Sequence, residues 1–194
     1  MKAIGSYIFA GSFTIGVKKH FNVLAHFEGD GYGADTFSLN YPEIPVFVGP
    51  ENWPTGDYKD VDFIYGNPPC APWSTLGSGS KGADGWKSDP RVSCWSDVFS
   101  LIYTVKPKAI AIESVPRAYS PTGGLPMIKD FTEKANKEGY AVTHLMVDGQ
   151  YTGLNHTRRR FFFLAHKGKF SPPAPNWNPS PNVGDVLDEF KAEH

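Results

Sequence analysis

The sequence predicts an α/β fold with a mostly parallel central sheet flanked by helices. Short apolar runs alternate with helix-length segments along the 194 residues, which is typical of successive β-α-β units. The chain is 40% hydrophobic and 14% aromatic, so it can bury the core of one sizeable domain. Its apolar runs are too short to cross a membrane, and the start, MKAIGSYIFAG, lacks the long apolar core of a signal peptide. We therefore expect a cytoplasmic protein.

Each expected strand is a short apolar run, and most are followed by a segment of helical length. The strands are expected at 3–9, 23–27, 61–65, 109–113, 141–147 and 161–166, and the helices at 13–20, 34–40, 92–105 and 126–138. The Gly- and Ser-rich residues 74–90 predict a mobile loop of the kind that often serves as a lid. From residue 171 the composition turns rich in Pro and Asn, and a short amphipathic segment follows at 183–190. We expect a domain at 1–170 and, at 171–194, a connector with a short C-terminal helix.

Charge and cysteine usage narrow the classes of protein. With 19 basic and 20 acidic residues the net charge is −1, whereas proteins that grip nucleic acid usually carry a basic surplus. The clearest local surplus is the run of arginines at 158–160. Cys70 and Cys94 belong to no CxxC pair or histidine cluster, which argues against a disulfide scaffold and a structural zinc site. We expect no bound metal.

Cys70 lies in the segment GNPPCAPWS, residues 66–74, directly after the apolar run 61–65. Pro68 and Pro69 restrict the backbone before it, so the loop should hold one extended path. A thiol presented rigidly at the carboxyl end of a strand is well placed to act as a nucleophile. The alternative is a small buried residue, which is what a lone cysteine more often is.

Glu113 and two arginines are further candidates. Glu113 follows the apolar strand AIAI, and burial there would raise its pKa, which suits a proton donor or a hydrogen-bond partner for a base ring. Arg158 and Arg160 alternate at the entrance to the expected strand 161–166, so both should point to one face and hold a phosphate or a carbonyl oxygen. The alternatives are a strand-end residue that caps a loop, for Glu113, and a charged edge that resists aggregation, for the arginines.

The amino-terminal segment predicts a ligand site of its own. The expected first strand ends in Phe9-Ala10-Gly11 and leads into a helix, an arrangement that offers backbone amides to a ligand. Glu28 follows the second strand, where an acidic residue commonly receives ribose hydroxyls. A solvated loop carboxylate is the alternative for Glu28.

Taken in order, these segments resemble the blocks of the DNA cytosine methyltransferases that modify carbon 5 of the ring. The resemblance covers nearly the whole chain, and the combination of PPC with the RxR strand is its most specific part. The segments that carry it are FAG, the acidic Glu28, Asn40-Tyr41-Pro42, PPC, DPR, PKAIAIESV and RRRFFFLAH. It implies a Rossmann-like, S-adenosylmethionine-dependent methyltransferase fold of bacterial or phage origin, from restriction–modification systems.

The resemblance also implies a role for each candidate. Cys70 would add to carbon 6 of a cytosine flipped out of DNA, Glu113 would hold the amino edge and ring nitrogen 3, and Arg160 would meet the base carbonyl with Arg158 as its partner. S-adenosylmethionine would be the methyl donor. The cofactor-binding positions that the resemblance gives are Phe9, Ala10, Gly11, Ser12, Glu28, Asn67 and Pro69. Cys94 falls where the family has an apolar residue.

Some positions depart from the family pattern. Ser12 and Phe13 stand where the first motif usually has two glycines, which implies a narrowed or altered cofactor pocket. Residues 181–190 resemble the segment after the RxR strand, but no target-recognition domain follows. We therefore expect a separate recognition chain or a homodimer, or else modification of DNA with little sequence preference. Two alternatives stay open: an enzyme that acts on a free nucleotide or transfers another group, and a non-catalytic subunit or decoy.

Overall fold

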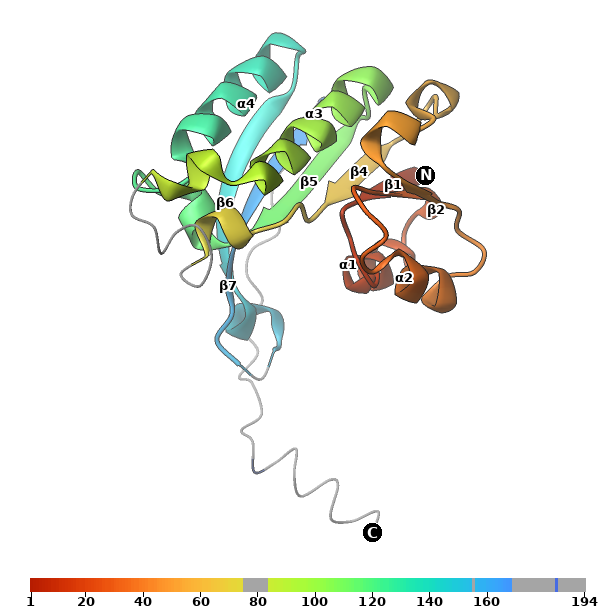
Figure 1. Ribbon diagram of the computed structural model, residues 1–194, viewed down its shortest axis with the longest axis horizontal. Helices are drawn as coiled ribbons and strands as arrows, with labels where there is room; N and C mark the ends of the chain where they lie inside the picture. Colours follow the sequence, from red (N-terminus) through yellow and green to blue (C-terminus); the bar gives the residue numbers. More distant parts are fainter. Residues whose placement is uncertain (75–83, 155, 169–183, 185–194) are drawn as a thin grey trace.

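The computed structural model describes residues 1–74, 84–154, 156–168 and 184, and a seven-stranded sheet forms its centre (Figure 1). The strands lie in the order β3-β2-β1-β4-β5-β7-β6. The first five pair in parallel, whereas β7 is antiparallel to both β5 and β6. The predicted α/β class with a mostly parallel sheet is therefore confirmed. The strands are β1 (Lys2–Ser6), β2 (Asn22–Glu28), β3 (Val46–Val48), β4 (Phe63–Gly66), β5 (Ala109–Ser114), β6 (Ala141–Asp148) and β7 (Arg159–His166).

Helices cover both faces of this sheet (Figure 1). Helices α3 (Ser93–Val105) and α4 (Leu125–Lys137) lie side by side on one face, and α1 (Ser12–Val17) and α2 (Ala34–Asn40) lie beside β1 and β2. Short 3-10 helices connect these elements. They are η1 (Pro50–Asn52), η2 (Thr55–Asp57), η3 (Ala71–Trp73), η5 (Gly85–Ser88), η6 (Pro90–Val92), η7 (Pro116–Tyr119) and η8 (Gly149–Thr152).

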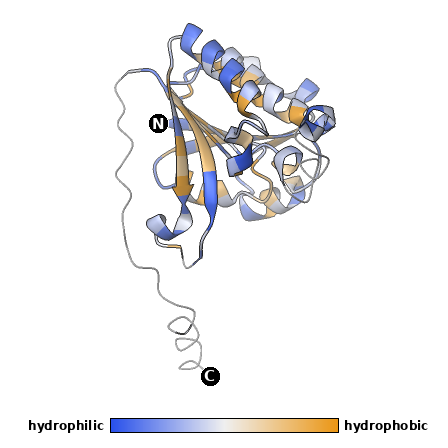
Figure 2. Cartoon of the chain, turned by 90° about the vertical axis from the view of Figure 1, so that its left-hand side faces the viewer, coloured by the Kyte–Doolittle hydropathy of each residue, from blue (hydrophilic) through white to orange (hydrophobic). Residues whose placement is uncertain are grey.

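The core divides into two apolar clusters, one on each face of the sheet. Under α3 and α4, the rings of Phe99 and Phe131 stack with centroids 3.7 Å apart, and Phe163 of β7 meets Phe99 edge-on. Under α1 and α2, Phe37 and Tyr65 are fully buried. Figure 2 shows the consequence: the strands are hydrophobic, and the outer faces of the helices are hydrophilic. In the described part of the chain, no helix is both long and apolar enough to span a membrane.

Several boundaries differ from the expected ones. The first strand ends at Ser6 rather than at residue 9, because Tyr7 and Phe9 have φ values of 55° and 52°, which end the extended backbone. Strand β3 was not expected, since its three residues give no detectable alternation. The expected loop 74–90 lies partly outside the described residues, and its described end instead forms η5, with Trp86 buried. The expected connector and helix at 171–194 lie outside the described residues, apart from residue 184.

Candidate functional site

The carboxyl ends of β1, β2, β4 and β5 meet at one edge of the sheet, as they must in a parallel arrangement. Two cavities open there. The first, which we call the Cys70 cavity, has a volume of about 530 Å³ and is lined by residues that include Phe9, Glu28, Asn67, Pro69 and Cys70. The second, the Glu113 cavity, has a volume of about 540 Å³ and is lined by residues that include Phe13, Asn67, Glu113, Arg158 and Arg160. Asn67 lines both cavities, so they are neighbours.

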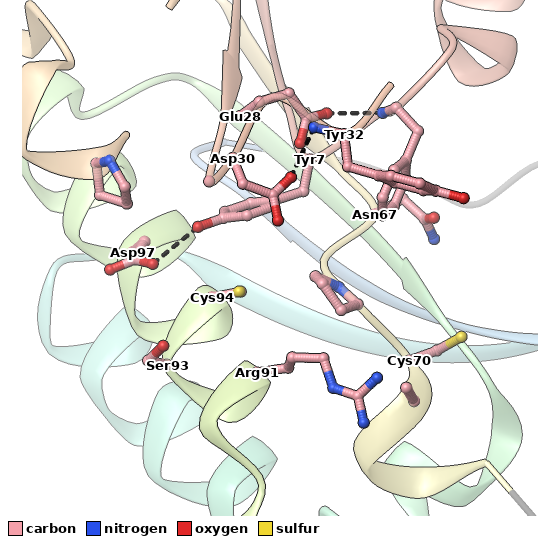
Figure 3. A pocket seen from close by; sticks show the side chains of 15 residues that line it. Tyr7, Glu28, Asp30, Tyr32, Asn67, Cys70, Arg91, Ser93, Cys94 and Asp97 are labelled. Carbon is pink, nitrogen blue, oxygen red and sulfur yellow. Dashed lines mark hydrogen bonds between the residues drawn. The ribbon is translucent and has the colours of Figure 1, made fainter. Parts of the chain in front are cut away.

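Cys70 is half-buried and immediately precedes η3, whose last residue is Trp73. The backbone N–H of Trp73 donates to the carbonyl of Cys70 at 3.0 Å. The Trp73 ring is buried and packs edge-on against Trp95 of α3, with centroids 5.3 Å apart. This aromatic contact anchors the turn, so the thiol is held at the rim of its cavity by buried structure on its C-terminal side (Figure 3).

An ion pair stands beside the Cys70 loop. The guanidinium of Arg91 extends toward that loop (Figure 3). It is bound in two places by Asp89, with Nε to Oδ1 at 2.9 Å and NH2 to Oδ2 at 2.6 Å. These hydrogen bonds raise the pKa of Arg91. The positive charge is thereby fixed in place at the wall of the cavity.

Acidic and aromatic side chains line the rest of the Cys70 cavity. Glu28 is 1% exposed, and its Oε1 accepts hydrogen bonds from the Phe9 amide at 2.7 Å and from His26 Nε2 at 2.8 Å. Tyr7 donates its hydroxyl proton to Asp97 of α3 at 2.8 Å, a contact that Figure 3 shows. Burial, followed by that hydrogen bond, raises the pKa of Tyr7 far above its ordinary value, so the phenol stays neutral.

Cys94 lies in the same cavity but has a different environment. It is half-buried on the first turn of α3, and burial raises the pKa of its thiol. The neighbouring Tyr7 side chain acts in the opposite direction but is the smaller effect. A raised pKa disfavours the thiolate, which is the reactive form of a cysteine. Cys94 is therefore poorly suited to act as a nucleophile.

The Glu113 cavity is built around an ion pair. Arg160 Nε lies 2.7 Å from Glu113 Oε1, and the two side chains are 24% and 17% exposed. Burial raises the pKa of Glu113 above its ordinary value, although the positive charges of Arg160 and Arg158 act to lower it. The sheet brings the two residues together, because β5 and β7 are adjacent antiparallel strands. Glu113 of β5 lies opposite Phe162 of β7, which is two residues from Arg160. The site thus joins a carboxyl that retains its proton more readily than usual with fixed positive charge.

The structure brings most of the expected residues to this edge of the sheet, in two groups. Phe9, Glu28, Asn67, Pro69 and Cys70 line the Cys70 cavity. The Glu113 cavity holds Ser12, Glu113, Arg158 and Arg160 together with Asn67. Neither cavity is lined by Ala10 or Gly11 in the described structure. The carbonyl of Ala10 accepts from Asn40 Nδ2 at 2.9 Å, and that of Gly11 accepts from the Tyr41 hydroxyl at 3.1 Å, so both contact the α2 end.

Sequence reasoning missed several side chains of the Cys70 cavity: Tyr7, Asp30, Tyr32, Arg91 and Asp97. Arg91 was visible within the DPR segment, and Asp30 lies two residues after Glu28. Tyr7 and Asp97 carried no usable signal, because they meet across 90 positions of sequence. Among the described residues, no cluster of three or more His, Cys, Asp or Glu side chains could hold a metal ion.

Curated proteins that are similar to this chain are methyltransferases. The chain is 29% identical over 177 residues to the Type II methyltransferase M.DdeI of Desulfomicrobium norvegicum, a match that covers 86% of this chain and 41% of the relative. It is also 29% identical over 150 residues to the Type II methyltransferase M.HaeII of Haemophilus aegyptius, covering 76% of this chain and 45% of the relative. The chain therefore spans about half the length of these relatives.

Solved structures share the fold at lower sequence identity. A prophage-encoded E. coli protein, provisionally described as a DNA modification methyltransferase, matches with a TM-score of 0.74 at 18% identity, covering 96% of this chain and 54% of that one. The Entamoeba histolytica methyltransferase EhMeth matches with a TM-score of 0.67 at 16% identity, covering 93% and 57%. These likenesses confirm the predicted S-adenosylmethionine-dependent methyltransferase fold.

The fold alone does not identify the family, but a family model does. The model of the C-5 cytosine-specific DNA methylases matches residues 7–191, which include both cavities and every candidate residue. Because that match extends over nearly the whole sequence, the chain belongs to the family of C-5 cytosine-specific DNA methylases.

Proposed function

We propose that this chain is the catalytic region of a DNA methyltransferase that transfers a methyl group from S-adenosylmethionine to carbon 5 of cytosine through a covalent adduct on Cys70. The observation that carries the proposal is the pairing of the two cavities. Cys70 lies in one, the Glu113–Arg160 pair lies in the other, and Asn67 lines both. A methyl donor in the first cavity and a base in the second would therefore meet at Asn67 and the loop that follows it.

The Cys70 cavity fits S-adenosylmethionine in size and chemistry. Its volume of about 530 Å³ lies within the range of cofactor pockets. Glu28 and Asp30 could accept hydrogen bonds from ribose hydroxyls, and their negative charge suits a cationic sulfonium. The rings of Phe9 and Tyr32, with centroids 6.2 Å apart, offer apolar surface to an adenine. When bound, the cofactor would supply the methyl group that carbon 5 accepts.

The residues around the second cavity suit activation of a cytosine ring. The sulfur of Cys70 would bond to carbon 6, and the electrons of the 5,6 double bond would move into the ring, toward carbon 5 and nitrogen 3. Glu113 would hold nitrogen 3 and the amino group, and its raised pKa favours the protonated form that can donate to nitrogen 3. Arg160 would meet the base carbonyl. After the methyl group has bonded to carbon 5, transfer of the carbon 5 proton to a base would restore the 5,6 double bond and expel the Cys70 thiolate.

Delivery of the base requires more than these two cavities. A cytosine that is stacked and paired inside a duplex cannot enter the Glu113 cavity, so the target would be flipped out of the helix. The curated relatives are about twice as long as this chain. We propose that target recognition comes from a separate chain or a second copy, within a restriction–modification or prophage system.

The first test is the trapping of a covalent adduct. The protein is incubated with S-adenosylmethionine and duplex DNA containing 5-fluorocytosine. Fluorine replaces the C5 proton in this base, so the final elimination cannot occur. We expect a denaturation-resistant protein–DNA complex. It should vanish in Cys70→Ser and persist in Cys94→Ser, a matched control because both thiols line the same cavity.

Three outcomes separate the hypotheses. A complex that survives in Cys70→Ser would exclude Cys70 as the nucleophile. Cofactor binding by calorimetry without any DNA adduct would favour a nucleotide substrate or a different transferred group. The absence of both, also when a recognition chain from a relative is added, would favour a non-catalytic subunit.

A further inference from the structure

The Glu113 cavity has an apolar wall as well as a charged one. Besides Glu113 and the two arginines, its lining includes Ile8, Phe13, Val147, Leu154 and Phe162. Phe13 comes from α1, whereas Glu113 comes from β5, Arg160 from the start of β7 and Arg158 from the residue before that strand. Ser12 and Phe13 thus line the Glu113 cavity, and in the described structure neither lines the Cys70 cavity. The change from the usual glycines therefore bears on the cavity that we propose for the base.

The position of the Phe13 ring is fixed by buried structure. It packs edge-on against Tyr65 of β4, with centroids 5.3 Å apart and planes at 64°. Tyr65 is fully buried, and its hydroxyl lies 2.8 Å from Thr14 Oγ1, the residue after Phe13. Tyr65 also stacks on Phe63 of the same strand. An aromatic ring held in this way can contact a ligand without losing much side-chain freedom.

The mixture of groups favours a planar base over a phosphate. Arg158 and Arg160 alone would suit a phosphate, but Glu113 pairs with Arg160 and would repel an anion. A base that has left the DNA stack loses its neighbours on both faces and gains from an aromatic surface. Its polar edge needs a carboxyl and a guanidinium, and its ring needs apolar contact. The Glu113 cavity offers both.

We infer that Phe13 is a base-binding residue that packs against the ring of the flipped pyrimidine while Glu113 and Arg160 hold its polar edge. This inference rests on the proposed function. Stacking of a base on an aromatic side chain corresponds to about a tenfold to a hundredfold effect on binding. Phe13 should therefore act on the affinity for DNA and not on the affinity for the cofactor.

The experiment compares Phe13→Ala and Phe13→Leu with the wild-type protein. Adduct formation with 5-fluorocytosine DNA is followed at increasing DNA concentration in a single turnover, and cofactor binding is measured by calorimetry. We expect the half-saturating DNA concentration to rise about tenfold in Phe13→Ala, and by less in Phe13→Leu, with the affinity for S-adenosylmethionine unchanged. Ile15→Ala is the matched control, because Ile15 is an apolar residue of the same helix that is 61% exposed.

Fluorescence of a base analogue at the target position reports contact with Phe13, and it would not change if Phe13 only stabilised the fold. With pyrrolocytosine at the target position, wild-type protein should quench the fluorescence of the flipped base, and Phe13→Leu should quench it less. Phe13→Leu keeps most of the apolar volume, so it carries the test if Phe13→Ala does not fold. Equal DNA affinity and equal quenching in wild type and Phe13→Leu would overturn the inference. Weaker cofactor binding by the Phe13 variants, with DNA binding unchanged, would overturn it as well. If the wild-type protein traps no DNA, also when a recognition chain from a relative is added, the proposed function itself fails.

Discussion

Two opposing influences act on the pKa of Glu113 within its cavity. Burial raises its pKa, and the charges of Arg160 and Arg158 lower it, with burial the larger effect. A carboxyl in this balance retains its proton more readily than a solvent-exposed one and still lies beside a positive charge. The same balance makes the residue sensitive to the loss of its partner, because Arg160 contributes both a charge and a hydrogen bond.

Replacement of Arg160 by methionine should raise the pKa of Glu113 further. The substitution removes the nearer charge that lowers this pKa and leaves burial in place, so the direction is upward. Titration of the labelled Glu113 carboxyl by NMR would measure it. Arg159→Met is the control, because Arg159 is exposed on the same strand and does not pair with Glu113 in the described structure. An unchanged or lowered pKa in Arg160→Met would contradict this account.

The β6–β7 connection positions one side of the Glu113 cavity. Asp148, the last residue of β6, accepts hydrogen bonds through Oδ1 from the amides of Gln150 at 3.4 Å and Arg158 at 3.1 Å. The Gly149 amide donates to the Arg158 carbonyl at 3.0 Å, which closes the turn. The backbone of Arg158 is therefore held at both its N–H and its C=O, next to Leu154, which also lines the cavity.

Removal of the Asp148 carboxyl should loosen this turn and weaken DNA trapping. Each lost hydrogen bond is worth about 1 kcal/mol, so we expect Asp148→Ala to slow adduct formation between roughly threefold and thirtyfold. Cofactor affinity should not change, because Asp148 lies outside the Cys70 cavity. Asp148→Asn keeps an acceptor oxygen and should retain most of the rate. Equal rates in Asp148→Ala and the wild type would show that the turn does not position Arg158.

The elements that the sequence predicts well are those with long apolar runs, and those it misses depend on contacts far apart in the chain. Strands β4, β5 and β7 begin and end within two residues of their expected bounds. The placement of β7 between β5 and β6 cannot be predicted from periodicity, because pairing between strands depends on residues far apart in the chain, such as Ala109 of β5 and His166 of β7. Likewise Cys70, Glu113 and Arg160 each stand next to an apolar run, whereas Asp97 lies within a helix and meets Tyr7 only in the folded chain.

Over the whole molecule, the charge distribution limits how firmly this chain can hold DNA. The net charge is −1, and several basic side chains are already paired with acids in the described structure: Lys87 with Asp84, Arg91 with Asp89, Lys108 with Asp62 and Lys134 with Asp130. Arg158, which lines the Glu113 cavity, and its neighbour Arg159 are exposed, whereas Arg160 is engaged by Glu113. A grip on the phosphates near this cavity would therefore use few contacts.

The salt dependence of DNA binding tests this directly. Each phosphate contact contributes about −0.9 to the slope of log affinity against log salt concentration. With contacts from the two exposed arginines only, we expect a slope of roughly −2 for the chain alone, measured by fluorescence anisotropy of a labelled duplex between low and physiological salt. The double variant Arg158→Gln with Arg159→Gln should flatten the slope by about 2. A much steeper slope that this variant leaves unchanged would place the main DNA contact elsewhere. A recognition chain that steepens the slope on addition would supply the missing basic surface.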